Sequence, residues 1–213
     1  MDPSYWKKRW DEGQIGFHRD VPNEFLERHH SKLGRRVFVP LAGKALDMRF
    51  LAAAGHDVVG CEIVDSAVHA FFDEAKLKPS IVVRAPFRLF SAGGVKLWCG
   101  DVFKLRAEDI GIIDGVYDRA ALVALTPDQR AAYVDVVLSL LRAGGSILLV
   151  TFSYDQSKID GPPFSVDDDV VHALFSPRCD IEKLEEREEA AGQKYLDAGV
   201  TSLREAAFLL RKR

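Results

Sequence analysis

Glu62 is the residue whose type and position most clearly suggest a binding function. It closes a predicted strand and lies 19 residues after Gly43, which sits in a turn behind an earlier predicted strand. An acidic side chain at about this spacing accepts hydrogen bonds from both hydroxyls of an adenosine ribose. The alternative is a solvated acid at a strand end, but the glycine turn upstream favours contact with a ribose.

The turn around Gly43 does not suit a ligand that carries phosphate. The run Leu41-Ala42-Gly43-Lys44-Ala45-Leu46 holds one glycine, whereas a dinucleotide fingerprint has three. The lysine also lacks the glycine spacing of a triphosphate-binding loop. Because a pyrophosphate needs several close backbone N–H groups, the turn favours a nucleoside without phosphate, such as S-adenosylmethionine.

Asp101 and Val102 follow the next predicted strand and a glycine. In an open parallel sheet the ligand lies beyond the carboxyl ends of the strands, so Asp101 could meet the adenine edge, with Val102 against the ring. The alternative is that Asp101 caps the next turn. The sequence gives the two interpretations nearly equal weight.

Aromatic side chains near the N-terminus could surround a cationic sulfonium. Trp6 and Trp10 are four residues apart and therefore share one face of a predicted helix, and Phe17 follows Gly16. The alternative is that the tryptophans only hold this helix against the core.

Arg119 follows a fourth predicted strand and could stabilise an anionic acceptor by charge and hydrogen bonding. The alternative is a salt bridge with Asp114 or Asp118 at the sheet edge. No metal site is expected, because the adjacent His29 and His30 face different ways on a helix.

The elements that must position these residues alternate as in a parallel sheet. Two adjacent strands at the end of the series indicate an antiparallel hairpin at the sheet edge, whereas a dinucleotide-binding domain would continue with βα units. The segment 87–98 contains Gly93-Gly94 and suggests an inserted hairpin or a bent lead-in. Strands are predicted at 37–41, 58–63, 96–99, 115–118, 146–152, 180–187 and 202–211, and helices at 22–31, 47–54, 66–77, 127–141 and 166–175, after a short N-terminal helix.

The bulk composition indicates one domain, residues 1–213, with 1–35 as a helical N-terminal cover over the ligand. With 29 basic and 32 acidic residues the net charge is −3, which argues against a nucleic-acid partner. The three cysteines are far apart and read as reduced. No apolar run has the length of a signal peptide or of a membrane span, so we expect a cytoplasmic protein without a membrane partner.

Taken together, these positions resemble the thiopurine S-methyltransferase family of class I S-adenosylmethionine-dependent methyltransferases. The resemblance runs nearly from end to end, and its motifs are specific in combination. They are Trp6-x-x-x-Trp10-x-x-Gly13-x-x-Gly16-Phe17-His18, Val37-Phe38-Val39-Pro40-Leu41-x-Gly43-Lys44, Gly55-His56-x-Val58-Val59-Gly60-x-Glu62, Tyr117-Asp118-Arg119-x-Ala121-Leu122-Val123-Ala124-Leu125, Ser153-Tyr154-Asp155 and Gly161-Pro162-Pro163-Phe164.

The resemblance implies an α/β, single-domain, Rossmann-like methyltransferase fold. It has a seven-stranded, mostly parallel sheet with an antiparallel C-terminal strand and helices on both faces. The S-adenosyl-L-methionine contacts that it implies are Trp10, Leu41, Glu62 and Arg119, with Trp6, Asp101 and Val102 close by.

On the acceptor side, the resemblance implies that Phe17 faces both the cofactor and the substrate. It places Arg119 and Arg187 near the thiopurine, as the candidates for catalysis. Pro163 and Phe164 look like a stiff wall beside the acceptor, because paired prolines preset the backbone, although Phe164 could be ordinary core.

The expected function is methyl transfer to the sulfur of a small aromatic or heterocyclic thiol, with selenium or tellurium compounds as further acceptors, by a monomeric enzyme. The alternatives are a NAD-dependent oxidoreductase and a non-catalytic nucleoside-binding module. Ala42 and Thr126 depart from the family pattern and leave the acceptor open.

Overall fold

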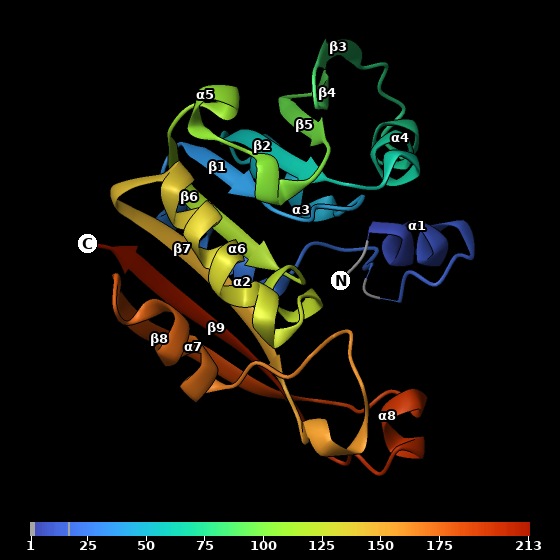
Figure 1. Ribbon diagram of the computed structural model, residues 1–213, viewed down its shortest axis with the longest axis vertical. Coiled ribbons are helices and arrows are strands. Elements are labelled where there is room, and N and C mark those ends of the chain that lie inside the picture. The colour runs from blue at the N-terminus through green and yellow to red at the C-terminus, as the bar shows by residue number, and fades with distance from the viewer. Residues whose placement is uncertain (1–2, 17) are drawn as a thin grey trace.

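The computed structural model describes residues 3–16 and 18–213, and a nine-stranded sheet runs through its centre (Figure 1). The order across the sheet is β3-β4-β5-β2-β1-β6-β7-β9-β8, and its five middle strands, from β5 to β7, run parallel. The strands are β1 Arg36–Val39, β2 Asp57–Glu62, β3 Ser80–Arg84, β4 Phe87–Ala92, β5 Val95–Cys99, β6 Ile113–Arg119, β7 Leu141–Ser153, β8 Cys179–Glu189 and β9 Leu203–Lys212.

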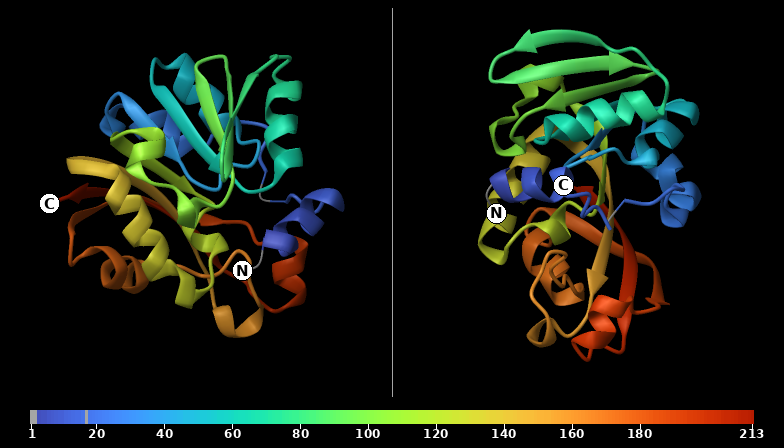
Figure 2. Two further views of the ribbon diagram at one scale, coloured as in Figure 1. Left: turned by 45° about the horizontal axis from the view of Figure 1, so that its top comes forward. Right: turned by 90° about the vertical axis from the view of Figure 1, so that its right-hand side faces the viewer.

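Helices cover both faces of this sheet (Figure 2). No helix in the described part of the chain is both long enough and apolar enough to cross a bilayer. The α-helices are α1 Pro3–Asp11, α2 Glu24–His29, α3 Leu46–Ala53, α4 Asp65–Glu74, α5 Ala107–Ile110, α6 Pro127–Leu140, α7 Asp168–Phe175 and α8 Gln193–Asp197, and the 3-10 turns are η1 His30–Leu33, η2 Val102–Lys104, η3 Leu122–Ala124 and η4 Gln156–Lys158.

The core consists of two apolar layers because successive residues of a strand point to opposite faces. In β1, Phe38 belongs to the cluster that contains the buried residues of α6 and α7, whereas Val37 belongs to the cluster that contains those of α3 and α4. Val59 and Val58 divide in the same way in β2. A strand that is buried on both faces has a continuous run of apolar residues in its sequence, as β1 and β2 do.

The segment that leads from α1 to β1 is tied to the rest of the molecule at Asn23. The Asn23 side chain caps α2 by accepting a hydrogen bond from the Phe25 N–H at 2.9 Å. The Asn23 N–H donates to the carboxylate of Asp47 at 2.8 Å, and the Tyr117 hydroxyl donates to the same carboxylate at 3.1 Å. This buried contact links the N-terminal segment to α3 and β6.

Most of the predicted elements are present. The C-terminal hairpin is confirmed, because β9 is antiparallel to both β7 and β8. The inserted hairpin is confirmed as β4 and β5. The count of seven strands is too low by two, because β4 and the unpredicted β3 extend the sheet at its other edge. The charged link between the last two strands contains the short helix α8.

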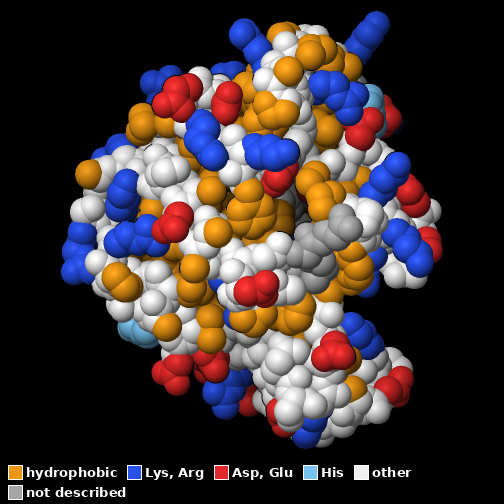
Figure 3. All heavy atoms as spheres, viewed as in Figure 1, with side chains coloured by type: hydrophobic (Ala, Val, Ile, Leu, Met, Phe, Trp, Pro, Cys, Tyr) orange, Lys and Arg blue, Asp and Glu red, His pale blue; other side chains and the backbone are white. Residues whose placement is uncertain are grey.

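The strand β3 escaped the sequence analysis because it lies at the sheet edge and none of its residues is buried. Ile81, Val82 and Val83 are 52%, 44% and 72% exposed. Figure 3 shows hydrophobic side chains with lysines and arginines beside them at the top of the molecule, over β3. An edge strand without a buried face lacks the alternation that marks half-buried strands.

Candidate functional site

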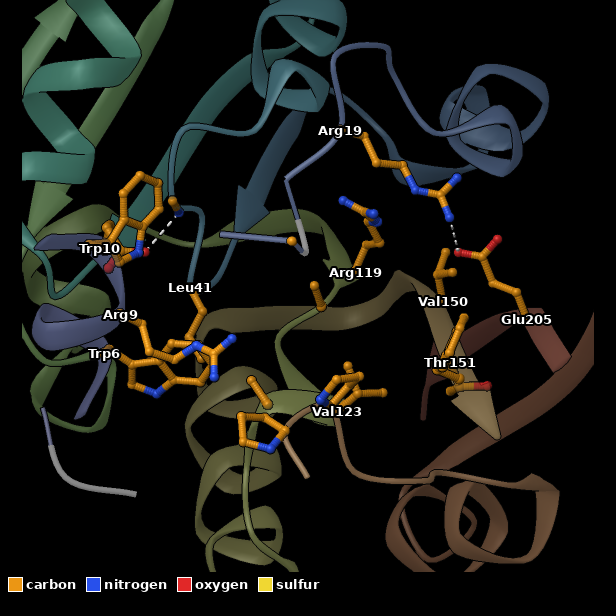
Figure 4. A pocket seen from close by; sticks show the side chains of 18 of the residues that line it. Trp6, Arg9, Trp10, Arg19, Leu41, Arg119, Val123, Val150, Thr151 and Glu205 are labelled. Carbon is orange, nitrogen blue, oxygen red and sulfur yellow. Dashed lines mark hydrogen bonds and ion pairs between the residues drawn. The ribbon is translucent and has the colours of Figure 1, made fainter. Parts of the chain in front are cut away.

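A cavity of about 370 Å³ opens at the carboxyl ends of the parallel strands (Figure 4). Residues that follow β1, β2 and β6 line it together with the last part of β7, and α1 and α8 contribute from outside the sheet. The lining residues are Trp6, Arg9, Trp10, Gly16, Arg19, Leu41, Gly43, Glu62, Ile63, Arg119, Ala120, Val123, Ala124, Val150, Thr151, Phe152, Pro162, Pro163, Lys194, Tyr195 and Glu205.

Glu62 ends β2 at the wall of this cavity and is only 6% exposed. One carboxylate oxygen accepts the Gly43 N–H at 2.7 Å and the other accepts the Val64 N–H at 2.8 Å. Burial raises the pKa of Glu62, while these N–H groups oppose the shift. A carboxylate has about four acceptor positions, so two remain for hydroxyl groups of a ligand. The interpretation as a solvated acid at a strand end is wrong.

The turn after β1 has a backbone that brings it close to an aromatic ring. Leu41 and Gly43 both have positive φ, at 45° and 52°. A Cβ on Gly43 would lie 3.2 Å from the Trp10 indole, so the absence of a side chain lets this ring pack against the turn. A non-glycine residue at positive φ, here Leu41, costs roughly 1–3 kcal/mol, and such strain clusters at ligand sites.

The two N-terminal tryptophans both line the cavity, and their predicted contact with the cofactor stays a prediction. Trp6 and Trp10 come from α1, and Figure 4 shows them on the same side of the cavity as Leu41. This position suits aromatic contact with a cation. Phe17, predicted to face cofactor and substrate, lies outside the described residues.

Arg119 ends β6, and its side chain lines the cavity. The two acids that could have paired with it have other partners: Asp114 accepts from Arg142 at 2.9 Å, and Asp118 accepts from the Tyr133 hydroxyl at 2.7 Å. Across residues 3–16 and 18–213, Arg119 makes no ion pair with an acidic side chain. Its charge is therefore available to a ligand.

Four predicted residues do not line this cavity: Asp101, Val102, Phe164 and Arg187. Asp101 caps η2 by accepting the Phe103 N–H at 3.0 Å, as the alternative interpretation proposed. Val102 is 6% exposed and packs in the core. The Phe164 N–H donates to the carbonyl of Val123, a lining residue, at 2.6 Å, so the Phe164 backbone lies next to the cavity wall. The cofactor contact predicted for Asp101 and Val102 stays a prediction.

Arg187, the second arginine predicted near the acceptor, contacts the cavity only through another residue. Its guanidinium lies over the Phe25 ring at 4.8 Å and donates to Glu24 at 2.7 Å and to Glu205 at 2.6 Å. Glu205 lines the cavity and is 3% exposed. The carboxylate, not the guanidinium, is thus what a ligand meets on this side.

Several lining residues were not anticipated from the sequence. Arg19 and Lys194 add positive charge, and Thr151 and Tyr195 add hydroxyl groups. Burial raises the pKa of Tyr195 to about 12, so this phenol is neutral. Two signals were available: Thr151 is a polar residue near the end of a very apolar strand, and Glu205 is an acid inside the last one.

The lining suits a nucleoside, with aromatic rings for a sulfonium on one side. Aromatic and aliphatic side chains make up most of the wall, and a buried carboxylate stands at a strand end as a ribose requires. Among the described residues, no group of three or more histidine, cysteine or acidic side chains could hold a metal ion.

Comparison with solved structures identifies the fold. A S-adenosylmethionine-dependent methyltransferase from Anabaena variabilis matches with a TM-score of 0.69 at 13% identity, covering 100% of this chain and 96% of that chain. The 1,6-didemethyltoxoflavin-N1-methyltransferase of Burkholderia thailandensis, solved with its substrate and S-adenosylhomocysteine, matches with a TM-score of 0.64 at 19% identity, covering 99% and 86%. The fold is that of the Rossmann-like S-adenosylmethionine-dependent methyltransferases.

Sequence comparison then gives the family. The model of the thiopurine S-methyltransferase family matches residues 1–213. The chain is 45% identical over 218 residues to a thiopurine S-methyltransferase of Pseudomonas entomophila, covering 100% of both, and 42% identical over 216 residues to one of Pseudomonas fluorescens, covering 99% of both. The chain belongs to the thiopurine S-methyltransferase family, whose methyl donor is S-adenosylmethionine. The oxidoreductase alternative is not favoured.

Proposed function

We propose that this chain transfers a methyl group from S-adenosylmethionine to the sulfur of a small aromatic or heterocyclic thiol, and to comparable selenium or tellurium compounds. The observation that carries the proposal is the cavity itself, whose apolar wall holds a buried carboxylate, Glu62, and a guanidinium, Arg119, without an acidic partner among the described residues. The family relatives are named for thiopurines, which supports the choice of sulfur as the acceptor.

The cofactor would be held by the residues that were predicted and that meet at the cavity. Glu62 would accept the ribose hydroxyls, and Trp10 with Leu41 would flank the rest of the cofactor beside Trp6. When bound, the cofactor supplies a methyl group that is already activated by a sulfonium. Little acid-base chemistry is then asked of the protein.

The chain's own contribution is alignment and charge. An apolar cavity that holds two reacting sulfur atoms in line and excludes water can supply roughly 7–11 kcal/mol of the barrier reduction. Pro163 and Phe152 form part of the wall. Arg119 would favour the anionic form of a thiol, because an opposite charge at close range lowers the pKa of an acid.

We also propose that the chain acts as a monomer of one domain in the cytoplasm, with residues 1–35 as a cover on the cofactor. The three cysteines, Cys61, Cys99 and Cys179, are free and buried, which suits a reducing compartment. Trp6, Trp10 and Arg19 from the cover line the cavity, which supports its role. Light scattering on the eluted protein tests the monomer, since a mass of twice 23.7 kDa would contradict it.

The direct test is methyl transfer to 6-mercaptopurine, followed by mass spectrometry of the S-methylated product and of S-adenosylhomocysteine. The Arg119→Met variant should lower kcat/KM roughly 10- to 100-fold, because a charge-assisted contact to the acceptor is lost. Arg178→Met, which changes an exposed arginine paired with Asp135, is the matched control and should behave as the wild type. Failure to methylate any aromatic thiol would refute the proposal.

A further inference from the structure

Arg187 and Glu205 form a cross-strand pair at the cavity wall. They are directly opposite in the antiparallel pairing of β8 with β9. The Arg187 guanidinium donates to Oε2 of Glu205 at 2.6 Å and also contacts Glu24 and Glu189 at 2.7 and 2.8 Å. This pairing fixes the direction of the Glu205 carboxylate, so Arg187 is a positioning residue for the cavity.

The second oxygen of the same carboxylate is poorly satisfied. Oε1 of Glu205 is 3.5 Å from the Asn23 side-chain nitrogen and 3.7 Å from the Arg19 guanidinium. Both distances exceed the 2.7–3.2 Å usual for an N–H donor and an oxygen. Since Glu205 is 3% exposed, and buried carboxylate oxygens are normally hydrogen-bonded, a donor on a bound molecule is the natural partner for Oε1.

Donors lie next to this acceptor. Arg19 and Arg119 both line the cavity, and Figure 4 shows their guanidinium groups on the side where Glu205 lies. The other carboxylate of the cavity, Glu62, already accepts two backbone N–H groups. The acceptor end therefore offers a carboxylate oxygen that has only long contacts, at 3.5 and 3.7 Å, beside two guanidinium groups.

A cyclic thioamide is the group that matches this arrangement. Its H–N–C=S unit presents one N–H donor directly beside a sulfur acceptor, and a plain aromatic thiol presents only the sulfur. We propose that Glu205 and Arg19 determine the acceptor specificity of the enzyme and select heterocycles whose sulfur is next to a ring N–H. The N–H donates to Oε1 of Glu205, and Arg19 with Arg119 donates to the sulfur. This rests on the proposed function, because it assumes that the acceptor sulfur is the methylated atom.

The Glu205→Gln variant tests the role of the Glu205 oxygen that faces the cavity, Oε1. Arg187 requires an acceptor, so the glutamine oxygen will turn toward Arg187 and its NH₂ group will face the cavity. The site then presents a donor to the N–H of a thioamide. A site built to hydrogen-bond an N–H loses much more for that ligand than for one that lacks it.

The experiment compares pyridine-2-thione with thiophenol, which has the same ring size and no ring N–H. In Glu205→Gln, calorimetry in the presence of S-adenosylhomocysteine should show the Kd for the thione rising at least ~10-fold. The kcat/KM for the thione should fall by the same factor. The Kd and kcat/KM for thiophenol should change less than ~3-fold. Arg187→Met should shift the same ratio in the same direction, and Arg187→Lys should restore part of it. Glu188→Gln, an exposed glutamate on β8, is the matched control.

Equal losses for both ligands, or no loss for the thione, would overturn the specificity role. If Glu205→Gln no longer binds S-adenosylhomocysteine, the comparison of Arg187→Met with Arg187→Lys decides instead. If the wild type methylates neither compound, the proposed function fails, but the two binding constants still test the recognition of the N–H group. If thiophenol is methylated and the thione ratio does not move, only the specificity role fails.

Discussion

At the residue scale, two buried carboxylates at strand ends have different environments. Glu62 ends β2 at the cavity and binds two backbone N–H groups. Asp118, near the end of β6, is 2% exposed and accepts from the Tyr133 hydroxyl and the Leu122 N–H. Glu62 is thus positioned for a ligand, whereas Asp118 organises the turn that follows Arg119.

Asp118 gives the protein a pH-dependent stability. Burial raises its pKa from 3.8 to about 6, against the opposing effect of Tyr133 and Leu122. Between these values the folded chain holds a proton that the unfolded chain has lost, so stability present below pH 4 declines as the pH rises to 6. Relative to Asp118→Asn, the free energy of unfolding should fall by about 2–3 kcal/mol from pH 4 to pH 7. Urea denaturation of both proteins measures this difference, and a flat or rising difference would contradict it.

Gly115 is required where β6 passes η1. A Cβ at this position would lie 2.0 Å from the carbonyl oxygen of Leu33, so backbone must move to accommodate any side chain. Gly115→Ala should destabilise the fold by about 3 kcal/mol or more. At Gly192, by contrast, no heavy atom lies within 4 Å of an added Cβ, so Gly192→Ala should leave the midpoint of thermal unfolding nearly unchanged. Similar midpoints for the two variants would refute this packing.

The sequence predicted the cavity residues at the ends of β1, β2 and β6 better than those around Glu205. Glu62, Leu41 and Arg119 follow predicted strands, and the rule that ligands bind beyond the carboxyl ends of parallel strands brings them together. Arg19 and Glu205 are 186 positions apart in the chain, and Glu205 comes to this wall through the pairing of β9 with β7. Position along the chain alone gives no sign of such a contact.

At the element scale, a side chain of the last strand, β9, caps the C-terminal end of α6. The Lys212 ammonium, in β9, donates to the carbonyls of Leu138 and Leu141 at 2.8 and 2.7 Å, where α6 ends and β7 begins. The Leu138 carbonyl belongs to the last turn of α6, where carbonyls lack a partner inside the helix, and a cation also suits the negative end of a helix dipole. The C-terminal hairpin and α6 are therefore coupled.

Lys212→Met should cost about 1–2 kcal/mol of stability, because it leaves these carbonyls without their charged donor. Arg211→Met, at the exposed neighbouring position, is the control and should cost less than about 0.5 kcal/mol. Denaturant midpoints of the two variants test this, and equal midpoints would show that the contact contributes nothing.

Element types were predictable where periodicity was strong. The helix predicted at 127–141 is α6, because Thr126 and Pro127 mark its start and apolar residues recur along it. The strand β3 was not predictable from the sequence, because its apolar residues Ile81, Val82 and Val83 are exposed. Its pairing with β4 also depends on a partner strand that the sequence does not identify. An edge strand is defined by its neighbour more than by its own pattern.

At the scale of the whole molecule, a ligand in the cavity contacts segments that are far apart in the chain. The cavity is lined by α1, by the ends of four parallel strands, by the prolines before α7 and by α8. Anything that binds this folded wall and not the unfolded chain stabilises the protein by mass action. S-Adenosylhomocysteine at 100 times its Kd should therefore raise the midpoint of thermal unfolding by about 5–10 °C. NAD at the same concentration should leave the midpoint unchanged, and an equal shift with NAD would contradict the assignment.

The measurement that decides most directly is a calorimetric titration with S-adenosylhomocysteine of the wild type, Glu62→Gln and Glu108→Gln, the last changing an exposed glutamate on α5. We predict one bound ligand per chain for the wild type and the Glu108 variant. We predict a Kd at least ~10-fold higher for the Glu62 variant, since a charge-assisted contact to the ribose is lost. A wild type that takes up no ligand, or a Glu62 variant that binds as tightly as the wild type, would contradict the assignment of Glu62 to the ribose.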